Sequence, residues 1–241
     1  MSARLDSLTH GVRGQGIPVA LNLWLAGFYI ALNVYQFIFL PLLLLPIDAA
    51  WGWTLLPAIA LTNPYWSLIH EAIHDLFHPN RSVNAFFGRL LSILFGAPFR
   101  ILRSSHLVHH KLNRLPVEGM EYYDRASSTK TRAAPGYYLQ IFLGLYLAEA
   151  LSPVYFLLPS RALVRLQERL LKPGSVSAIL MQNWLGAAAL REIRFDGCLA
   201  ISWFVLAAAC YGTHWSLLVG AWLGRAFLIS FLDNVYHYAT P

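Results

Sequence analysis

Five of the chain's nine histidines fall into two short groups. The first group, His70 and His74, lies in the stretch HEAIH, and the second, His106, His109 and His110, lies in HLVHH. Residues three or four positions apart share one face of a helix, so each group can point its imidazoles at a common spot. Because imidazole is the commonest metal-binding side chain, the two groups together predict a metal site.

The number of imidazoles indicates more than one metal ion. A catalytic zinc usually takes three protein ligands and a water, whereas two neighbouring metals would use all five histidines. The spacing leaves the metal open, since imidazole binds zinc, copper, iron and nickel. His78 continues the four-residue spacing but precedes Pro79, so we expect it beside the site or on the surface rather than as a ligand.

The stretch HEAIH also matches H-E-x-x-H, the zinc metalloprotease pattern in which the glutamate, here Glu71, is the general base. An intramembrane zinc protease is therefore an alternative. It would need a third zinc ligand, and Glu149 is the acidic residue deep inside an apolar tract. This alternative gives the HLVHH histidines no role.

The composition sets these residues in a membrane protein. The chain is 57% hydrophobic and only 12% charged, against about 25% charged residues in soluble proteins. Uncharged tracts long enough to cross a bilayer predict an all-α integral membrane protein of one domain, with about four transmembrane helices in two hairpins and a cytoplasmic helical cap that carries the histidines. The expected spans are residues 17–45, 49–69, 197–212 and 214–232.

A further apolar run, residues 137–158, is interrupted by Glu149 and Pro153. If this run crossed the membrane, the basic segment after it would lie outside, against the rule that positive loops stay in the cytoplasm. We therefore expect a non-spanning or re-entrant run that is bent at Pro153.

Basic residues set the orientation. Of the 18 Lys and Arg residues, nine lie in residues 70–136 and six in residues 160–195, so both segments are expected on the cytoplasmic side. The net charge of +6 is explained by these flanking residues, which attract anionic lipid, and we expect no nucleic-acid partner.

The chain resembles the membrane fatty acid desaturase family of di-iron desaturases and hydroxylases. The resemblance rests on HEAIH and HLVHH as the first two histidine boxes, on the segment that joins them, and on DNVYHYATP at residues 233–241. It implies two iron ions, a fatty-acyl or other lipid substrate, O2, and a separate electron donor of the ferredoxin or cytochrome b5 kind. It also implies a multi-pass protein, here of a bacterial inner membrane, with its boxes on the cytoplasmic face.

The resemblance also assigns residues. It implies that His70, His74, His106, His109, His110 and His237 are iron ligands and that Asn234 touches the metal through water. Acidic side chains that could orient the imidazoles are Glu71, Asp75, Glu118, Glu121, Asp124 and Asp233.

The family's third HxxHH box is not among the 241 residues. We expect either a C-terminally shortened form of a working enzyme or an inactive metal-binding relative, and the nearness of Pro241 to the YHY stretch favours the first.

The expected reaction is oxygen-dependent oxidation of a lipid acyl chain, with desaturation as the first hypothesis. Hydroxylation of a lipid or a carotenoid is the alternative within the same family.

Overall fold

The computed structural model describes residues 16–112 and 128–237, the last two of these by their backbone alone. This part of the chain is helical and contains no strand. Three continuous helical stretches in it are long and apolar enough to cross a membrane: Val19–Leu44, Lys130–Phe156 and Ala187–Val235. The prediction of an all-α integral membrane protein is confirmed.

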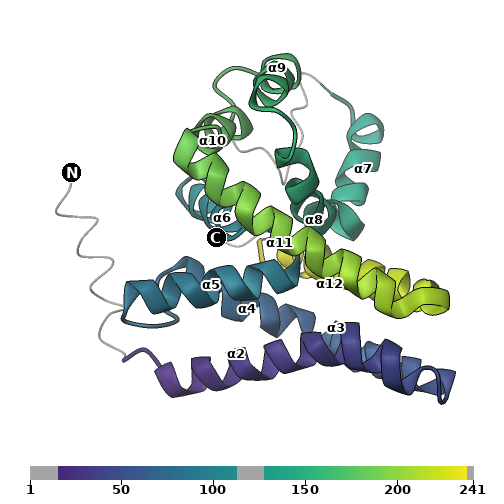
Figure 1. The fold of residues 1–241 in the computed structure, drawn as a ribbon. Helices are drawn as coiled ribbons and strands as arrows, with labels where there is room; N and C mark the ends of the chain where they lie inside the picture. Colours follow the sequence, from purple (N-terminus) through teal and green to yellow (C-terminus); the bar gives the residue numbers. More distant parts are fainter. Residues whose placement is uncertain (1–15, 113–127, 238–241) are drawn as a thin grey trace.

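Helix α2 (Val19–Val34) runs directly into the π-helix η1 (Tyr35–Leu44) to form the first of these stretches. The chain returns through η2 (Ala49–Thr54), α3 (Leu55–Ala60) and α4 (Thr62–Ile73). Figure 1 shows this return leg beside α2, and the stacked rings of Tyr29 and Tyr65, with centroids 4.8 Å apart, join the two legs.

The return leg is broken, although the sequence predicts one span over residues 49–69. Helix α3 ends at Ala60 and α4 begins at Thr62. Pro64 explains the break, because it has no N–H to donate to the carbonyl of Ala60 and its ring would clash with that carbonyl in a continuous helix.

The apolar run at residues 137–158 is helical without a break as far as Phe156. The helical stretch consists of α7 (Lys130–Leu139), η3 (Gln140–Gly144) and α8 (Leu145–Phe156). Helix α8 continues through Pro153, which leaves the carbonyl of Glu149 without its helical donor, and the Ser152 hydroxyl donates to that carbonyl at 2.6 Å. The re-entrant position expected for this run stays a prediction.

The last stretch folds back on itself, as the split near residues 211–214 predicts. Helix α11 (Ala187–Tyr211) ends at the short helix η4 (Gly212–His214), and α12 (Trp215–His237) returns beside it (Figure 1). Gly212 has φ +48°, a left-handed value that glycine adopts without strain. Gly197 of α11 lies close to Pro153 of α8, where a Cβ atom would come within 3.3 Å of the Pro153 Cα.

The two helices between the first hairpin and α7 form a sharp corner. Helices α5 (Arg81–Phe95) and α6 (Phe99–Leu112) are bent by 100° relative to each other. Gly96 ends α5 with φ +113°, and the N–H groups of Gly96 and Ala97 both donate to the carbonyl of Ser92. This glycine-terminated helix end turns α6 back towards α4.

Buried polar side chains hold α5 against its neighbours. Asn84 donates to the Ala72 carbonyl at 2.8 Å, and its own oxygen accepts from the backbone N–H of Phe77. Arg89 pairs with the fully buried Asp196 of α11 at 2.5 Å. Because an unpaired buried carboxylate is costly, this pair fixes the position of α5 on α11.

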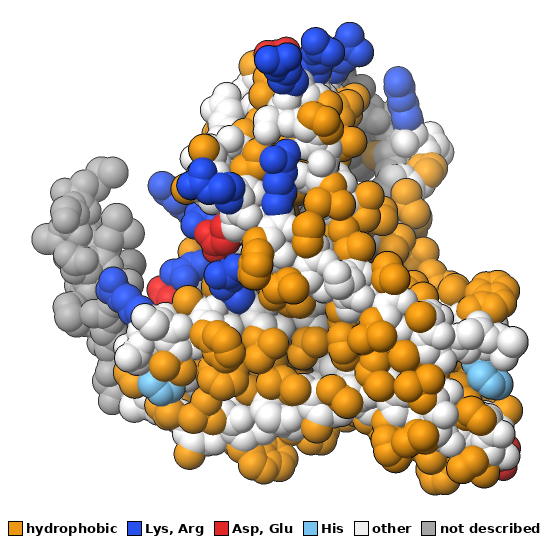
Figure 2. All heavy atoms as spheres, viewed as in Figure 1, with side chains coloured by type: hydrophobic (Ala, Val, Ile, Leu, Met, Phe, Trp, Pro, Cys, Tyr) orange, Lys and Arg blue, Asp and Glu red, His pale blue; other side chains and the backbone are white. Residues whose placement is uncertain are grey.

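Helices α9 (Ser160–Leu170) and α10 (Val176–Trp184) cover α6 and the end of α8. Lys and Arg side chains gather over this part of the molecule, whereas the surface over α2 and the membrane-spanning helices is mostly hydrophobic (Figure 2). This separation of charge is the one that a membrane requires.

The corner at Gly96 can be tested with Gly96→Ala. A Cβ atom there would overlap the Phe204 ring, and the left-handed backbone conformation adds about 1–2 kcal/mol. We expect a lower midpoint of thermal unfolding in detergent. Gly136→Ala is the matched control, since Gly136 lies exposed in α7 with open space around it, and it should leave the midpoint unchanged or raise it slightly. Equal midpoints for the two variants would show that the corner does not depend on glycine.

Candidate metal centre

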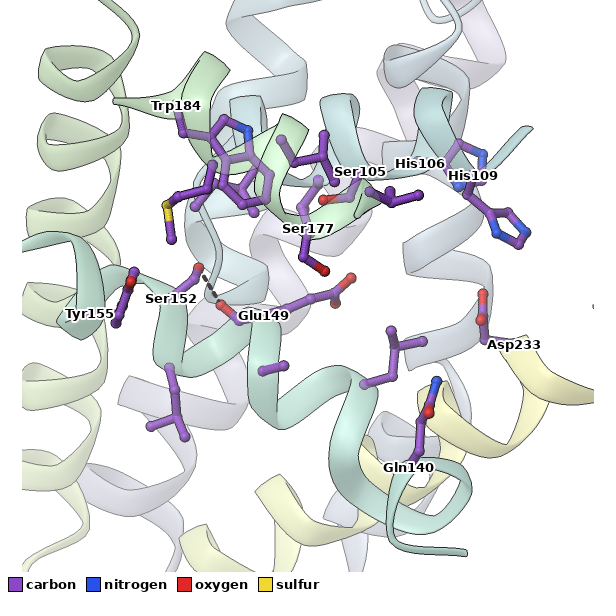
Figure 3. Close-up of a pocket in the computed structure, with 18 of the residues that line it drawn as sticks. Ser105, His106, His109, Gln140, Glu149, Ser152, Tyr155, Ser177, Trp184 and Asp233 are labelled. Carbon is purple, nitrogen blue, oxygen red and sulfur yellow. Dashed lines mark hydrogen bonds between the residues drawn. The ribbon is translucent and has the colours of Figure 1, made fainter. Parts of the chain in front are cut away.

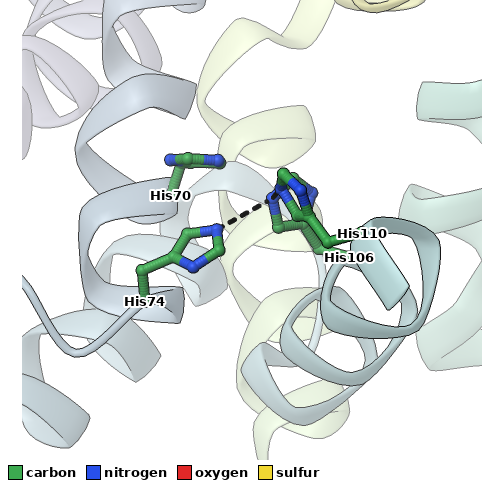
Figure 4. A group of neighbouring side chains, drawn as sticks. All are labelled: His70, His74, His106 and His110. Atoms are coloured by element: carbon green, nitrogen blue, oxygen red, sulfur yellow. Dashed lines mark hydrogen bonds between the residues drawn. The ribbon is translucent and has the colours of Figure 1, made fainter. Parts of the chain in front are cut away.

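Four histidines from two helices meet at one point. The ligand atoms of His70, His74, His106 and His110 all lie within 4.8 Å of one another. The Nε2 atom of His106 is 3.2 Å from that of His74 and 2.7 Å from that of His110. Figure 4 shows the two pairs facing each other across a short gap. Ring nitrogens that converge in this way are the donor set of a transition-metal site.

The first pair sits where α4 ends. His70 is in the last turn of the helix, and His74 is the residue that follows its last helical residue, with its N–H still donating to the His70 carbonyl. The next residue, Asp75, has φ +60° and turns the chain away. The helix therefore presents both imidazoles on one face and stops before a further turn covers them.

The second pair comes from the last turn of α6, and an ion pair aligns it with the first. Arg103 of α6 donates to the Asp75 carboxylate at 2.6 Å. Trp184 of α10 donates to the Ser104 hydroxyl at 2.7 Å and holds the other side of α6. The edge of the Trp66 ring lies against the His106 ring, with centroids 6.4 Å apart.

The site favours neutral imidazoles. Burial, together with the smaller effect of the neighbouring His70, His110, His74 and His109, lowers the pKa of His106 to about 3. Burial likewise lowers the pKa of His74, with a contribution from His110. A neutral imidazole keeps the lone pair that binds a metal, so these side chains are ready as ligands near neutral pH.

His109 lies on another side of α6. It is outside the four-histidine group and lines a cavity of about 990 Å³, which His106 also borders (Figure 3). On an α-helix, position 109 is rotated by about 60° from position 106 and by about 100° from position 110. The structure thus brings together four of the five predicted box histidines and places the fifth at the cavity.

The cavity lies between α6, α8, α9, α10 and the end of α12. Its walls are mainly apolar, with Leu145, Leu166, Met181 and Trp184 among the lining residues. Its volume is in the range of small-molecule sites, about 300–1,000 Å³. A long apolar molecule placed here would lie beside His106 and His109.

The other predicted site residues are spread around this centre. Asn234 and Asp233 of α12 line the cavity. Asp75 bonds to Arg103 and to Asn84, so its carboxylate braces the corner between α4, α5 and α6. Glu71 is half-buried beside His70 on α4, and burial raises its pKa.

His78 lies apart from the four histidines, in the loop before α5, where its Nδ1 atom accepts from the Asn80 N–H. His237 is the last residue of α12, and its side chain lies outside the described residues. The predicted orienting residues Glu118, Glu121 and Asp124 also lie outside the described residues.

Several cavity residues were missed from the sequence. No motif marks the lining residues Ser105 of α6, Tyr155 of α8, and Ser177 and Trp184 of α10. Helix α9 did carry a signal: Leu163, Leu166 and Leu170 follow the three- and four-residue spacing of an amphipathic helix. Leu163 is buried, and Leu166 and Leu170 line the cavity.

The state of His106 predicts how stability depends on pH in the metal-free protein. Its pKa falls from about 6.5 in the unfolded chain to about 3 in the folded one. Between these pH values the unfolded state therefore binds more protons than the folded state. The contribution of the neutral His106 to the free energy of unfolding is fully present above pH 6.5 and is lost as the pH drops towards 3. After chelation, we expect the unfolding midpoint to decrease from pH 7 to pH 5.

The variant His106→Gln should show a shallower decrease over the same range. His214→Gln, in the turn between α11 and α12, should keep the wild-type slope. An unchanged slope in the first variant would mean that His106 is not held neutral by the fold.

The comparison with protein-family models gives a match. The family model for fatty acid desaturases matches residues 47–241, a range that includes both histidine pairs, His109 and the cavity. Neither the comparison with curated proteins nor that with solved structures gives a match. The match to the family model covers most of the chain, and the chain belongs to the fatty acid desaturase family.

Proposed function

We propose that the chain oxidises the acyl chain of a lipid with molecular oxygen at iron held by its histidines, and that the reaction is a desaturation. One observation carries the proposal: His106 belongs to the four-histidine group and also borders the large apolar cavity. A substrate in that cavity would lie directly beside the candidate metal centre.

The residues fit a transition-metal ion. Four imidazoles converge, and the group that they form contains no carboxylate among the described residues. Family membership favours iron over the other metals that imidazole binds. Iron would supply the oxygen activation that breaks an unactivated C–H bond, which acid–base side chains cannot do.

A second ion would use the remaining candidates. His109 and Asn234 both line the cavity, and His237 follows Asn234 by three residues on α12, so the two share a helix face. We propose His70, His74, His106 and His110 for the first ion, and His109 and His237 for the second, with Asn234 acting through water.

The chain's own part is to position the substrate and exclude water. Apolar side chains of α8, α9 and α10 would hold an extended acyl chain, and Trp66 would limit its approach to His106. The end of α4 at His74 and the corner before α6 would keep the imidazoles fixed while the substrate binds. Such fixed geometry places one methylene beside the centre.

The basic side chains over α9 and α10 support a cytoplasmic position for the histidines. We propose that a separate donor of the ferredoxin or cytochrome b5 kind delivers electrons there, and that the protein lies in a bacterial inner membrane.

The test is expression of the full chain in bacteria, followed by mass spectrometry of the extracted lipids and metal analysis of the purified protein. We expect acyl chains that have lost two hydrogens, and iron as the bound metal. His106→Ala should abolish the product and lower the iron content, whereas His214→Ala should change neither. Bound iron without a changed lipid would contradict the proposal and favour an inactive relative.

Other products would favour the alternatives. Acyl chains with one added oxygen would show a hydroxylase. One zinc ion per chain, together with proteolytic activity that Glu71→Gln abolishes, would show the zinc protease. In a desaturase, Glu71→Gln should have only a modest effect, because the proposed chemistry needs no general base at that position.

The assignment of ligands to two ions has its own test. His110→Ala and His109→Ala should each lower the iron content, and the double variant should lower it further, because the two side chains would serve different ions. Inductively coupled plasma mass spectrometry measures the ratio. A full iron content in His109→Ala would remove His109 from the ligand set.

A further inference from the structure

The cavity beside the candidate metal centre has an unusual distribution of charge. Two carboxyl side chains, Glu149 of α8 and Asp233 of α12, are in its wall. Among the described lining residues there is no Lys or Arg. The remaining polar groups are neutral hydroxyls and amides, apart from the two histidines.

Glu149 brings a buried polar atom into this wall. Its Oε2 atom is buried and has no hydrogen-bond partner among the described residues. Figure 3 shows its side chain extending from α8 into the cavity, with Ser105 of α6 and Ser177 of α10 on the facing side. A buried polar atom without a partner costs free energy, so a ligand that offers a hydrogen-bond donor at this position would be stabilised.

An anionic lipid does not fit the same place. The carboxylate of a free fatty acid would enter an apolar cavity next to two carboxyl groups, with no cation in the described wall to pair with it. Burial of an unpaired ion is strongly unfavourable. In the metal-free protein, the described wall therefore offers a fatty-acid carboxylate no positive charge to pair with.

We propose that the substrate is a neutral long-chain lipid with a hydroxyl or amide N–H group, and that this group donates a hydrogen bond to Glu149. The inference rests on the proposed function, because it names the substrate class of the same cavity. Since Glu149 and the two histidines line one cavity, the donor held at Glu149 would set which methylene of the chain lies beside His106 and His109.

The experiment measures binding to the purified, metal-free full chain in neutral detergent. A fluorescent long-chain alcohol is the probe, and four competitors of one chain length displace it: an alcohol, a primary amide, the methyl ether of the alcohol, and the free fatty acid at neutral pH. We expect the alcohol and the amide to displace the probe at concentrations about tenfold lower than the ether or the fatty acid, as expected when a buried acceptor is left unpaired.

Variants of Glu149 test whether this side chain causes the preference for the alcohol. Glu149→Leu should remove the advantage of the alcohol over its methyl ether, whereas Glu149→Gln, which keeps an acceptor oxygen, should retain most of it. Glu168→Gln is the matched control, because Glu168 is exposed on α9 and lies outside the cavity. It should leave all four affinities unchanged.

Two results would overturn the inference: a fatty acid that binds the wild type as tightly as the alcohol, or an alcohol preference that persists in Glu149→Leu. The first comparison needs no variant, so it decides the question even if Glu149→Leu does not fold. The binding measurement depends on neither iron nor product. If the competitors rank as expected but no lipid is oxidised, the proposed function alone is contradicted. If a lipid is oxidised but the competitors rank differently, this inference alone is contradicted.

Discussion

The geometry of the candidate centre depends on the 100° corner between α5 and α6. The two pairs of imidazoles are separated by about thirty residues of sequence, and a straight continuation of α5 would carry the second pair away from the first. Gly96 accepts the left-handed conformation that turns the chain, and the Arg103–Asp75 ion pair then aligns α6 with the end of α4. The convergence of the histidines thus depends on a corner that contains none of them.

The same convergence has an electrostatic cost that a metal ion would relieve. Four imidazoles within 4.8 Å would repel one another if all were protonated. Burial and this repulsion together lower the pKa of His106. A bound cation would take the place of the excluded protons, and its ligands would be neutral already. The fold therefore holds the imidazoles in the neutral state that metal binding requires.

Sequence spacing predicted the parts of this site that lie within one helix. His70 with His74, and His106 with His110, share a face because of helical periodicity, and the structure brings the two pairs together. The separate position of His109 follows from the same periodicity, since i+3 and i+4 lie on opposite sides of i. The breaks in the helices were harder to predict: Pro64 interrupts a helix, whereas Pro153 is accommodated because Ser152 replaces the missing donor.

The cavity could not be predicted from the sequence, because its walls come from elements that are distant along the chain and because its position depends on how α9 and α10 pack over α6. Glu149 illustrates the difference. In the sequence it is an acidic residue inside an apolar tract, and the protease alternative makes it a zinc ligand. In the structure it lies outside the four-histidine group and lines the cavity. Its carboxyl group thus lines the cavity and does not join the four imidazoles, so tertiary packing decides between two roles that the residue type alone leaves open.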